Sequence, residues 1–379
     1  MLKSSLMMNK KDLFYFVGGC LALDEQPGFR NEVIRLASTI DWEEFVRLCS
    51  NHLILPAIFR RFEQHQLLSY LPNDLVEHLH EVYVLNVERN EAILAQVEKI
   101  VALLNEHGIK PTFLKGVAHL LDCVYDDLGD RMMSDIDFLV DEASYLPAAE
   151  ILLNAGYLQD RPVSSYSKVE ELKHYPRLFH PHYVASVEVH RIPVDAEFAS
   201  WFSSSQVRGE QVEVKSLDGC FVPSDRHKIV HNFIHSQLSN EGDLFGRISL
   251  RAAFDLLLLA KRFPLPETLP LIKKKQKAVA YFSLVNKLLL GEGSKHFNPG
   301  FASWWLKNKH ALNLKSDLFR RVFSHTIFLG QRILKGYLLQ IFKAFYLKES
   351  RSYIFKRLVD RKWYGDHARL YSRFFRREV

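Results

Sequence analysis

The sequence has little cysteine, no long apolar run and no internal repeat, and each shortage excludes a class of protein. Its four cysteines lie far apart and form no CxxC pair, which argues against a cysteine zinc site and indicates a reducing, cytoplasmic location. No uninterrupted apolar stretch approaches the ~20 residues of a membrane-spanning helix. The hydrophobic share of 47% is ordinary, so most of the chain is expected to fold.

Charge and the N-terminus carry weaker signals. The formal charge of +6 permits a polyanionic partner without requiring one. The opening "MLKSSLMMNKKDLFYFVGGCLAL" has lysines before an apolar patch, as a secretion signal does, but residues 9–12, "NKKD", interrupt it. We therefore expect "DLFYFVGGCLAL" to be a first helix.

Hydrophobic periodicity predicts an α+β protein in three parts: an N-terminal helical region over 1–108, an α/β core over 109–222 and a C-terminal helical region over 223–379. In the first part, Pro56 should kink or restart a helix. A long helix, broken at most once, should begin at an Asn73 or Asp74 cap and run towards the stop at Gly108.

The core is expected to hold a short mixed sheet. The segments "KPTFLKG", "SDIDFLV", "ASVEVHRI" and "QVEVKSLDGCFVP" are typical of extended structure. Helices are predicted at "VAHLLDCVY" and at "EASYLPAAEILLNAGY", and a polar connection rich in Tyr, His and Pro spans about 160–183. Strands alternating with helices predict an α/β arrangement.

Two aspartates stand one residue apart in the apolar segment "RMMSDIDFLV". In a strand, Asp135 and Asp137 share one face, roughly 7 Å apart, where two like charges resist burial. One interpretation is a strand end at which they are solvated or paired with Arg131. The other is a site for Mg²⁺, which prefers carboxylate oxygens and often binds substrate phosphates at the same time.

Two neighbouring segments favour the metal site. In "VEVH", Glu188 and His190 share one face of a strand, so a third carboxylate can join the first two if the strands pair. In "FLKGVAHLL", a strand passes through Lys115 and Gly116 into a helix, where a glycine allows close backbone approach and a lysine attracts an anion. Arg131 could add a phosphate contact.

Read in order, "FLKGVAHLL", "SDIDFLV", "AAEILLNAGY" and "VEVHR" resemble the nucleotidyltransferase superfamily of DNA polymerase β. More closely, they are similar to a bacterial family of uncharacterised nucleotidyltransferases, whose members read "LKG…R…DiDlLV…LlealGY…idlHw". The segments "NHLILPAIFRRF" and "HNFIHSQL…RISLRAAFDLLLL" are similar to the helical parts of that family. The resemblance covers about residues 30 to 260 and is strongest over 113–157.

The resemblance implies a minimal nucleotidyltransferase fold and metal-dependent nucleotidyl transfer. By position, Asp135, Asp137 and Glu188 would be catalytic and would bind two Mg²⁺ ions, with Glu188 nearer the acceptor. The nucleotide-binding residues would be Lys115, Gly116, Arg131, Ser134 and His190. The superfamily's usual Gly-Ser turn is absent here, since Lys115 precedes Gly116 and a valine follows it.

The expected reaction moves a nucleoside monophosphate, AMP, from a nucleoside triphosphate, ATP, to an unidentified acceptor hydroxyl or phosphate. A small molecule, a saccharide precursor, a protein and an RNA end remain open as acceptors. Replacing Asp135 and Asp137 together by asparagine should abolish turnover and leave the fold intact or slightly more stable. The alternatives are a catalytically silent nucleotide-binding or scaffold protein, and a protein that binds RNA or an anionic membrane through its basic C-terminal tail.

Each of the other polar groups allows a functional and a purely structural interpretation. His227, His231 and His235 share a helix face at spacings of four, which suits a metal site or a cleft-lining helix. Arg251 and Asp255 suit an intrahelical ion pair or a role in the cleft. The aromatic, basic tail after about residue 300 suits RNA, an anionic membrane or a solvated helical cap.

Overall fold

The computed structural model describes residues 8–160, 169–291, 297, 300–331, 334, 338–347, 351, 354–355, 359 and 364–365. The chain forms two compact units, Met1–His310 and Ala311–Val379, and each is described by itself. The expected boundaries at 108 and 222 both fall inside the first unit, and the three-part division stays a prediction.

Helices form the N-terminal part, as the periodicity predicted. They are α1 (Lys10–Leu21), α2 (Phe29–Leu36), α3 (Trp42–Asn51), α4 (Leu55–Gln64), the single turn η1 (Leu68–Tyr70) and α5 (Asn73–Glu106). Pro56 lies in the first turn of α4, where its missing N–H has no helical partner to lose, so it restarts the helix. Helix α5 is continuous, begins after Pro72 and ends before Gly108, which adopts a φ of 73°.

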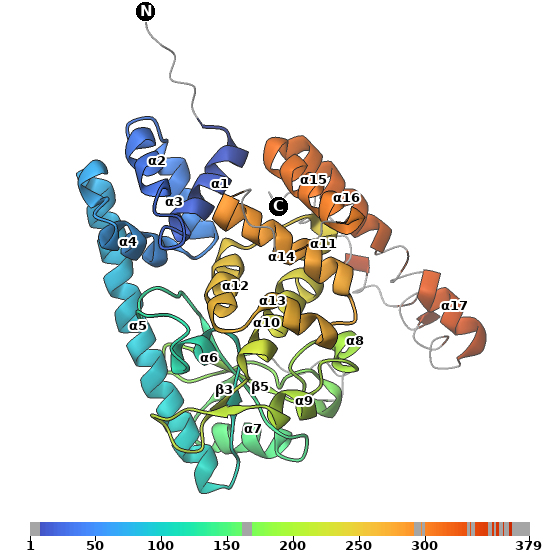
Figure 1. The fold of residues 1–379 in the computed structure, drawn as a ribbon. Coiled ribbons are helices and arrows are strands. Elements are labelled where there is room, and N and C mark those ends of the chain that lie inside the picture. Colours follow the sequence, from blue (N-terminus) through green and yellow to red (C-terminus); the bar gives the residue numbers. More distant parts are fainter. Residues whose placement is uncertain are drawn as a thin grey trace, which may run out of the picture. The chain divides into compact units, whose positions relative to one another are not determined.

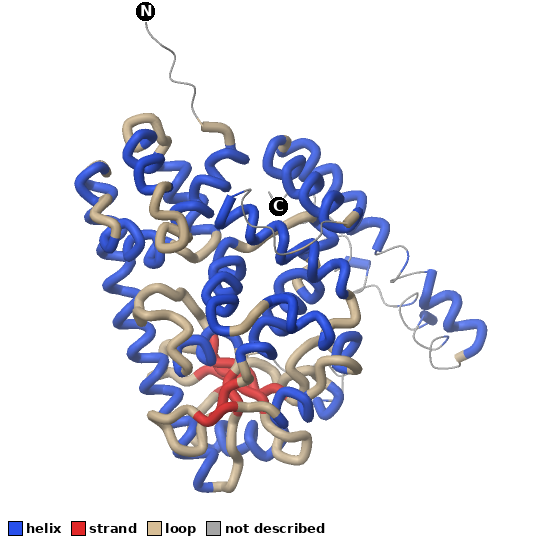
Figure 2. The backbone as a smooth tube through the Cα atoms, in the orientation of Figure 1, coloured by secondary structure: helices blue, strands red, loops and turns tan. Residues whose placement is uncertain are grey.

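A seven-stranded mixed sheet forms the core, and Figure 2 shows its strands gathered among helices. Its strands are β1 (Thr112–Phe113), β2 (Asp135–Leu139), β3 (Leu158–Gln159), β4 (Leu178–Phe179), β5 (Ser186–His190), β6 (Val212–Glu213) and β7 (Phe221–Val222). They lie in the order β3-β4-β5-β2-β1-β7-β6. The fold class is therefore α+β, as expected, and the two longest strands, β2 and β5, lie side by side and parallel.

Short helices connect the strands and cover the sheet. They are α6 (Lys115–Leu121), α7 (Tyr145–Asn154), the turn η2 (Val169–Glu171), α8 (Ala196–Ala199) and α9 (Ser204–Gly209). Helix α7 packs against β5 and against the long helix α5, which runs from the N-terminal helices down to the sheet (Figure 1). The apolar residues of β2 and β5 are buried, and the acidic residues alternate with them along each strand.

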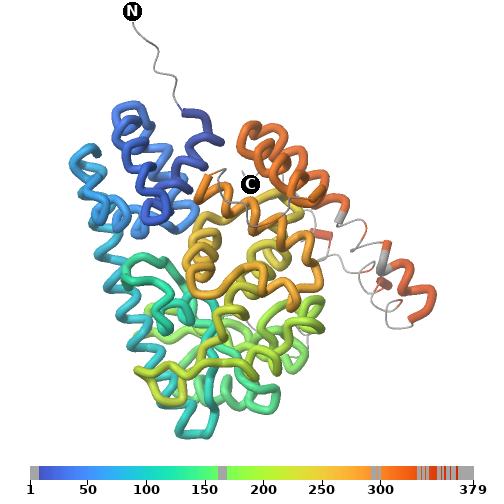
Figure 3. Tube along the Cα trace, in the orientation of Figure 1, coloured from blue at the N-terminus to red at the C-terminus, as the bar shows by residue number. Residues whose placement is uncertain are grey.

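The rest of the first unit is helical. It holds α10 (Asp225–Phe233), the π-helical turn η3 (Ile234–Ser239), α11 (Gly242–Phe245), α12 (Leu250–Arg262), α13 (Leu265–Thr268), the turn η4 (Leu269–Leu271), α14 (Lys275–Leu290) and the first part of α15 (Phe301–Lys315). Helix α10 packs on α12, and α14 returns to pack on α1 from the other end of the unit (Figure 3). The N- and C-terminal helices of this unit thus share one core.

The second unit continues from α15 into α16 (Asp317–Gln331) and α17 (Leu339–Tyr346). Both helices expose large apolar side chains, among them Leu318 and Val322 on α16 and Phe342 and Phe345 on α17. Within the described part of the chain, no helix combines the length and the apolar content needed to cross a membrane.

Candidate active site

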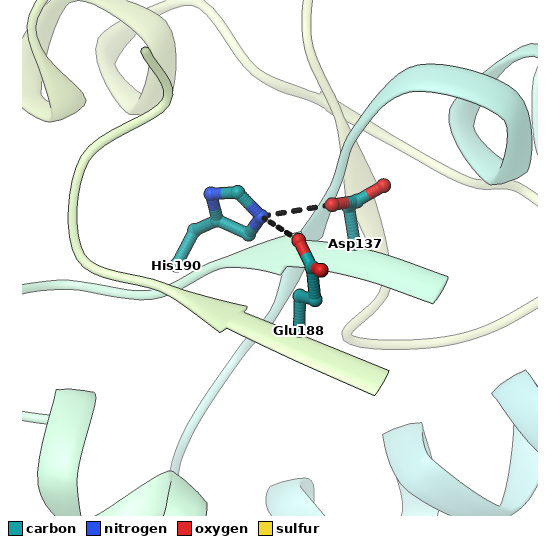
Figure 4. Close-up of side chains that lie close together, drawn as sticks. All are labelled: Asp137, Glu188 and His190. Carbon is teal, nitrogen blue, oxygen red and sulfur yellow. Dashed lines mark hydrogen bonds and ion pairs between the residues drawn. The ribbon is translucent and has the colours of Figure 1, made fainter. Parts of the chain in front are cut away.

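Strands β2 and β5 bring the acidic side chains together. Their parallel register sets Asp137 opposite Glu188 and Leu139 opposite His190, so the condition under which the carboxylates can meet is fulfilled. One ligand atom from each of Asp137, Glu188 and His190 lies within 4.8 Å of the other two (Figure 4). These three residues are the one group with metal-ligand chemistry among the residues described.

Asp137 lies at the centre of this group and is buried. Its Oδ1 accepts hydrogen bonds from Lys115 Nζ at 2.7 Å and from His190 Nε2 at 2.8 Å. Burial alone would raise the pKa of Asp137, but the Lys115 charge and these hydrogen bonds outweigh it and hold the pKa well below its usual range. Burial lowers the pKa of His190, whereas hydrogen bonds to Asp137 and Glu188 raise it by more, so the net shift is upward.

The turn into α6 supports this lysine. Lys115 has a φ of 53°, a left-handed conformation that costs a lysine about 1 kcal/mol or more and aims its side chain at Asp137. At Gly116, an added Cβ would come within 2.6 Å of Arg131 Nη1. The close approach expected at this glycine is therefore made by the Arg131 side chain.

Asp135 is partly exposed at the start of β2, and Glu188 is buried beside it. Glu188 Oε1 accepts from Arg177 Nη2 at 2.9 Å, and the same nitrogen is 4.0 Å from Asp135 Oδ2. Burial and then the charge of Asp137 raise the pKa of Asp135. Burial also opposes ionisation of Glu188, but hydrogen bonds from His190 and Arg177 lower its pKa to about 2.

Two functional neighbours were missed by the sequence analysis. Arg177 and His174 come from the connection that we treated only as polar and rich in Tyr, His and Pro. His174 forms an isolated β-bridge with His190, and its Nε2 is 3.7 Å from Glu188 Oε2. The density of histidine and arginine in "KHYPRLFHPHY", directly before the acidic strand, was the available signal.

Arg131 is held by an aspartate from α12. Its Nε and Nη2 donate to the two oxygens of Asp255 at 2.8 and 2.9 Å, and both side chains are buried. Tyr125 also donates to Asp255, at 2.5 Å. Burial would raise the pKa of Asp255, but the Arg131 charge holds it well below its usual range. The expected phosphate contact of Arg131 stays a prediction, and its pairing with Asp135 or Asp137 at the strand end is not formed.

Arg251 and Asp255, four residues apart on α12, do not form the intrahelical ion pair that was one of their two interpretations. Both oxygens of Asp255 accept from Arg131, whereas Arg251 Nη1 donates to the Met132 carbonyl oxygen at 2.9 Å. The two residues therefore join helix α12 to the segment that leads into β2.

A cavity of about 470 Å³ opens beside the acidic cluster. The core lines one wall, with Lys115, Gly116, Arg131, Ser134 and Asp135, and the C-terminal helices line the other, with Lys228, His231, His235 and Arg251 among others. Ser134 Oγ also lies 3.4 Å from Asp135 Oδ1. The site expected from the sequence thus has a neighbouring space in which a ligand can lie.

The three histidines of α10 and η3 separate in the structure. His231 and His235 line the cavity, whereas His227 packs on Phe202 and lies 3.2 Å from the Ser224 hydroxyl. Burial and then nearby charges lower the pKa of His231 well below its usual range and that of His235 to about 4, so both rings are neutral near pH 7. They offer hydrogen bonds to a ligand without adding charge.

The acidic cluster fits a divalent metal. Asp137 and Glu188 offer the hard carboxylate oxygens that Mg²⁺ prefers, within ligand distance of each other and of His190, whereas Asp135 is not a member of this group. Burial and then the charge of Asp137 raise the pKa of Asp135, and a nearby cation would relieve the second of these effects. In this structure Lys115 and Arg177 supply compensating positive charge.

Comparison with known proteins gives one result that bears on function. A family model described as uncharacterised nucleotidyltransferase matches residues 38–275. The match includes β2, β5, the acidic cluster and most of the residues that line the cavity. Comparison with curated proteins finds no match.

Proposed function

Because the chain belongs to the uncharacterised nucleotidyltransferase family and is an enzyme of that class, we propose that it transfers a nucleoside monophosphate, AMP, from ATP to an acceptor hydroxyl or phosphate. One observation carries this proposal. Acidic side chains of two parallel strands meet beside a cavity whose walls carry lysines and arginines. An acidic metal-binding edge beside a basic wall suits a metal-bound triphosphate.

Each acidic residue has a role in this proposal. Asp135, Asp137 and Glu188 would hold two Mg²⁺ ions, which supply charge neutralisation at the reacting phosphate and the leaving pyrophosphate. The acceptor hydroxyl loses its proton to solvent, its oxygen bonds the α-phosphorus, the bond from the α-phosphorus to the α,β-bridging oxygen breaks and pyrophosphate leaves. Glu188 would lie nearer the acceptor, since its partner Arg177 is exposed on that side, and His190 orients both Glu188 and Asp137.

The residues of the core wall would bind the triphosphate. Lys115 Nζ, now on Asp137, can move to a phosphate oxygen when a metal ion takes its place. Gly116 leaves room for the Arg131 side chain, and Ser134 offers a hydroxyl beside Asp135. His190 contributes through its contacts with the metal-binding carboxylates.

The test is transfer of label from α-³²P nucleoside triphosphates in the presence of Mg²⁺ and a cell lysate. Separating the products by size, with protease and nuclease treatment, distinguishes a small molecule or saccharide precursor from a protein or an RNA end. We expect label from ATP to appear on one acceptor, and Asp135→Asn to abolish it. If the wild-type protein neither transfers label nor binds Mg²⁺–ATP, it is a silent scaffold and the proposal fails.

Lys115→Ala tests whether Lys115 contacts the triphosphate. It should weaken binding of ATP by about tenfold or more and binding of AMP much less, because a charged hydrogen bond to phosphate is worth about 1.5–3 kcal/mol. Lys110→Ala, an exposed lysine in the same segment, is the matched control. An equal loss for ATP and AMP would remove Lys115 from the triphosphate site.

We further propose that the second unit docks on an anionic membrane surface, and that the protein is cytoplasmic. Residues 311–379 hold sixteen lysines and arginines but only five acidic residues. The exposed apolar side chains of α16 and α17 favour a lipid surface over RNA, since they would bury among acyl chains. Full-length protein should co-sediment with vesicles containing phosphatidylglycerol and not with phosphatidylcholine vesicles. Binding to single-stranded RNA without vesicle binding would overturn this assignment.

A further inference from the structure

Two arginines meet at one carbonyl oxygen on the cavity wall. Arg251 Nη1 donates to the Met132 oxygen at 2.9 Å, and Arg131 Nη1 lies 3.3 Å from the same atom. Two guanidinium groups that share one acceptor are close enough to repel each other. In agreement, burial and then the Arg131 charge lower the pKa of Arg251.

The carboxylate beside these two arginines, Asp255, is paired with Arg131. Asp255 gives one oxygen to each of two Arg131 nitrogens, and it also accepts from Tyr125. Its other neighbour, His119, lies 3.3 Å away and has a pKa lowered first by burial, so the ring adds no positive charge near pH 7. Among the residues described, no carboxylate accepts a hydrogen bond from Arg251. One positive charge therefore remains in excess at this wall.

Because Arg251 lines the cavity, the excess positive charge lies at the cavity wall. Arg131 is buried and fixed by Asp255, while Arg251 is half-buried and lines the cavity from the first turn of α12. Asp135 lines the same cavity from the core side, and its charge acts on both arginines. A ligand that reaches from a metal at Asp135 to Arg251 must carry negative charge along its length.

We propose that Arg251 holds the terminal phosphate of the nucleoside triphosphate, as a contact that α12 adds to those of the core. This inference rests on the proposed function. Arg131 acts as a positioning residue, because it ties α12 to the core through Asp255 and shares the Met132 carbonyl with Arg251. A contact between Arg251 and the terminal phosphate would make the affinity for a nucleotide depend on its number of phosphates.

The experiment measures binding of α,β-methylene ATP, ADP and AMP to the full chain with Mg²⁺ by titration calorimetry. The methylene bridge prevents release of pyrophosphate, so the readout does not depend on an acceptor. Arg251→Gln should weaken binding of the ATP analogue by about 10- to 100-fold, the range for loss of a charged hydrogen bond, and binding of AMP by less than about threefold. Arg251→Lys should recover part of the lost affinity, since lysine keeps the positive charge but lacks the paired N–H donors of a guanidinium.

Arg262→Gln is the matched control, because Arg262 ends the same helix, pairs with Asp122 and Asp225, and does not line the cavity. It should leave binding of all three nucleotides unchanged, and thermal unfolding should show all variants folded. An equal loss of ATP analogue and AMP with Arg251→Gln, or no loss, overturns this inference alone. If the wild-type chain binds no nucleotide, the proposed function fails instead.

Discussion

The two aspartates of β2 should respond in opposite ways to loss of their charge. Asp137 is buried and accepts hydrogen bonds from Lys115 and His190, whereas Asp135 is partly exposed and its pKa is raised by burial and by Asp137. Asp137→Asn leaves the Lys115 ammonium and the His190 ring without the carboxylate that they contact. Asp135→Asn removes a charge that its neighbours already disfavour.

The structure sets the size of each effect. Removing one partner of a buried ion pair costs about 3–5 kcal/mol of unfolding free energy. We expect the lower end, about 3 kcal/mol, for Asp137→Asn because the Lys115 side chain is 22% exposed and can recover water. For Asp135→Asn we expect a change of about 0–1 kcal/mol towards greater stability, since its contact with Arg177 is long and exposed.

Urea unfolding at pH 7 with EDTA, followed by circular dichroism, measures both values without bound metal. The sequence alone suggested that removing both charges would leave the fold intact or slightly more stable. The contacts of Asp137 revise that expectation, and the double variant should now be destabilised. Equal stability of the two single variants would refute the assignment of Lys115 and His190 as the partners that make Asp137 tolerable in the core.

Three further predictions follow from other contacts. Gly116→Ala should cost about 1–3 kcal/mol in urea unfolding, because its Cβ would collide with Arg131 Nη1, and a smaller change would show that the arginine can move aside. Arg177→Gln should raise Mn²⁺ affinity about two- to fivefold in calorimetry, because it frees Glu188 from an exposed ion pair, and an unchanged affinity would contradict competition between the arginine and the metal. Burial raises the pKa of Asp130 to about 7, so the native state holds a proton there that the unfolded state has lost, and the contribution of Asp130 to stability should fall as pH rises from about 4 to about 7. Buried histidines with lowered pKa values act in the opposite direction in both proteins, so the test is the difference in unfolding free energy between wild type and Asp130→Asn, and a difference that does not change with pH would show that Asp130 does not titrate there.

The elements with strong local patterns were predictable from the sequence. Alternation of apolar and acidic residues identified β2 and β5 as strands, whereas their pairing was only a condition of the proposed site. Helix α5 and its end at Gly108 followed from periodicity and from the glycine stop. These predictions succeeded because the physical cause lies within a few neighbouring residues.

Partner choice between distant segments was not predictable. Arg131 could have paired with the β2 aspartates, with a phosphate or with α12, and only the packing of α12 beside the core sets its partner as Asp255. Arg177 reaches Glu188 because β4 pairs with β5, and β4 has only two residues, too few for a period-two pattern. Long charged side chains can take several partners, so sequence alone leaves their choice open.

The contacts of Lys115 imply that metal and nucleotide bind together. In this structure its ammonium lies on Asp137 Oδ1, so a metal ion bound to that oxygen must displace it. A displaced ammonium next to a divalent cation is unfavourable unless an anion accepts it, and a triphosphate in the cavity supplies that anion. We therefore expect Mg²⁺ to bind weakly alone and more tightly with ATP, and by linkage ATP to gain the same factor from Mg²⁺. Lys115→Ala should raise the affinity for the ion alone and reduce the gain that ATP provides, a pairing of effects that a lysine with a purely structural role would not produce.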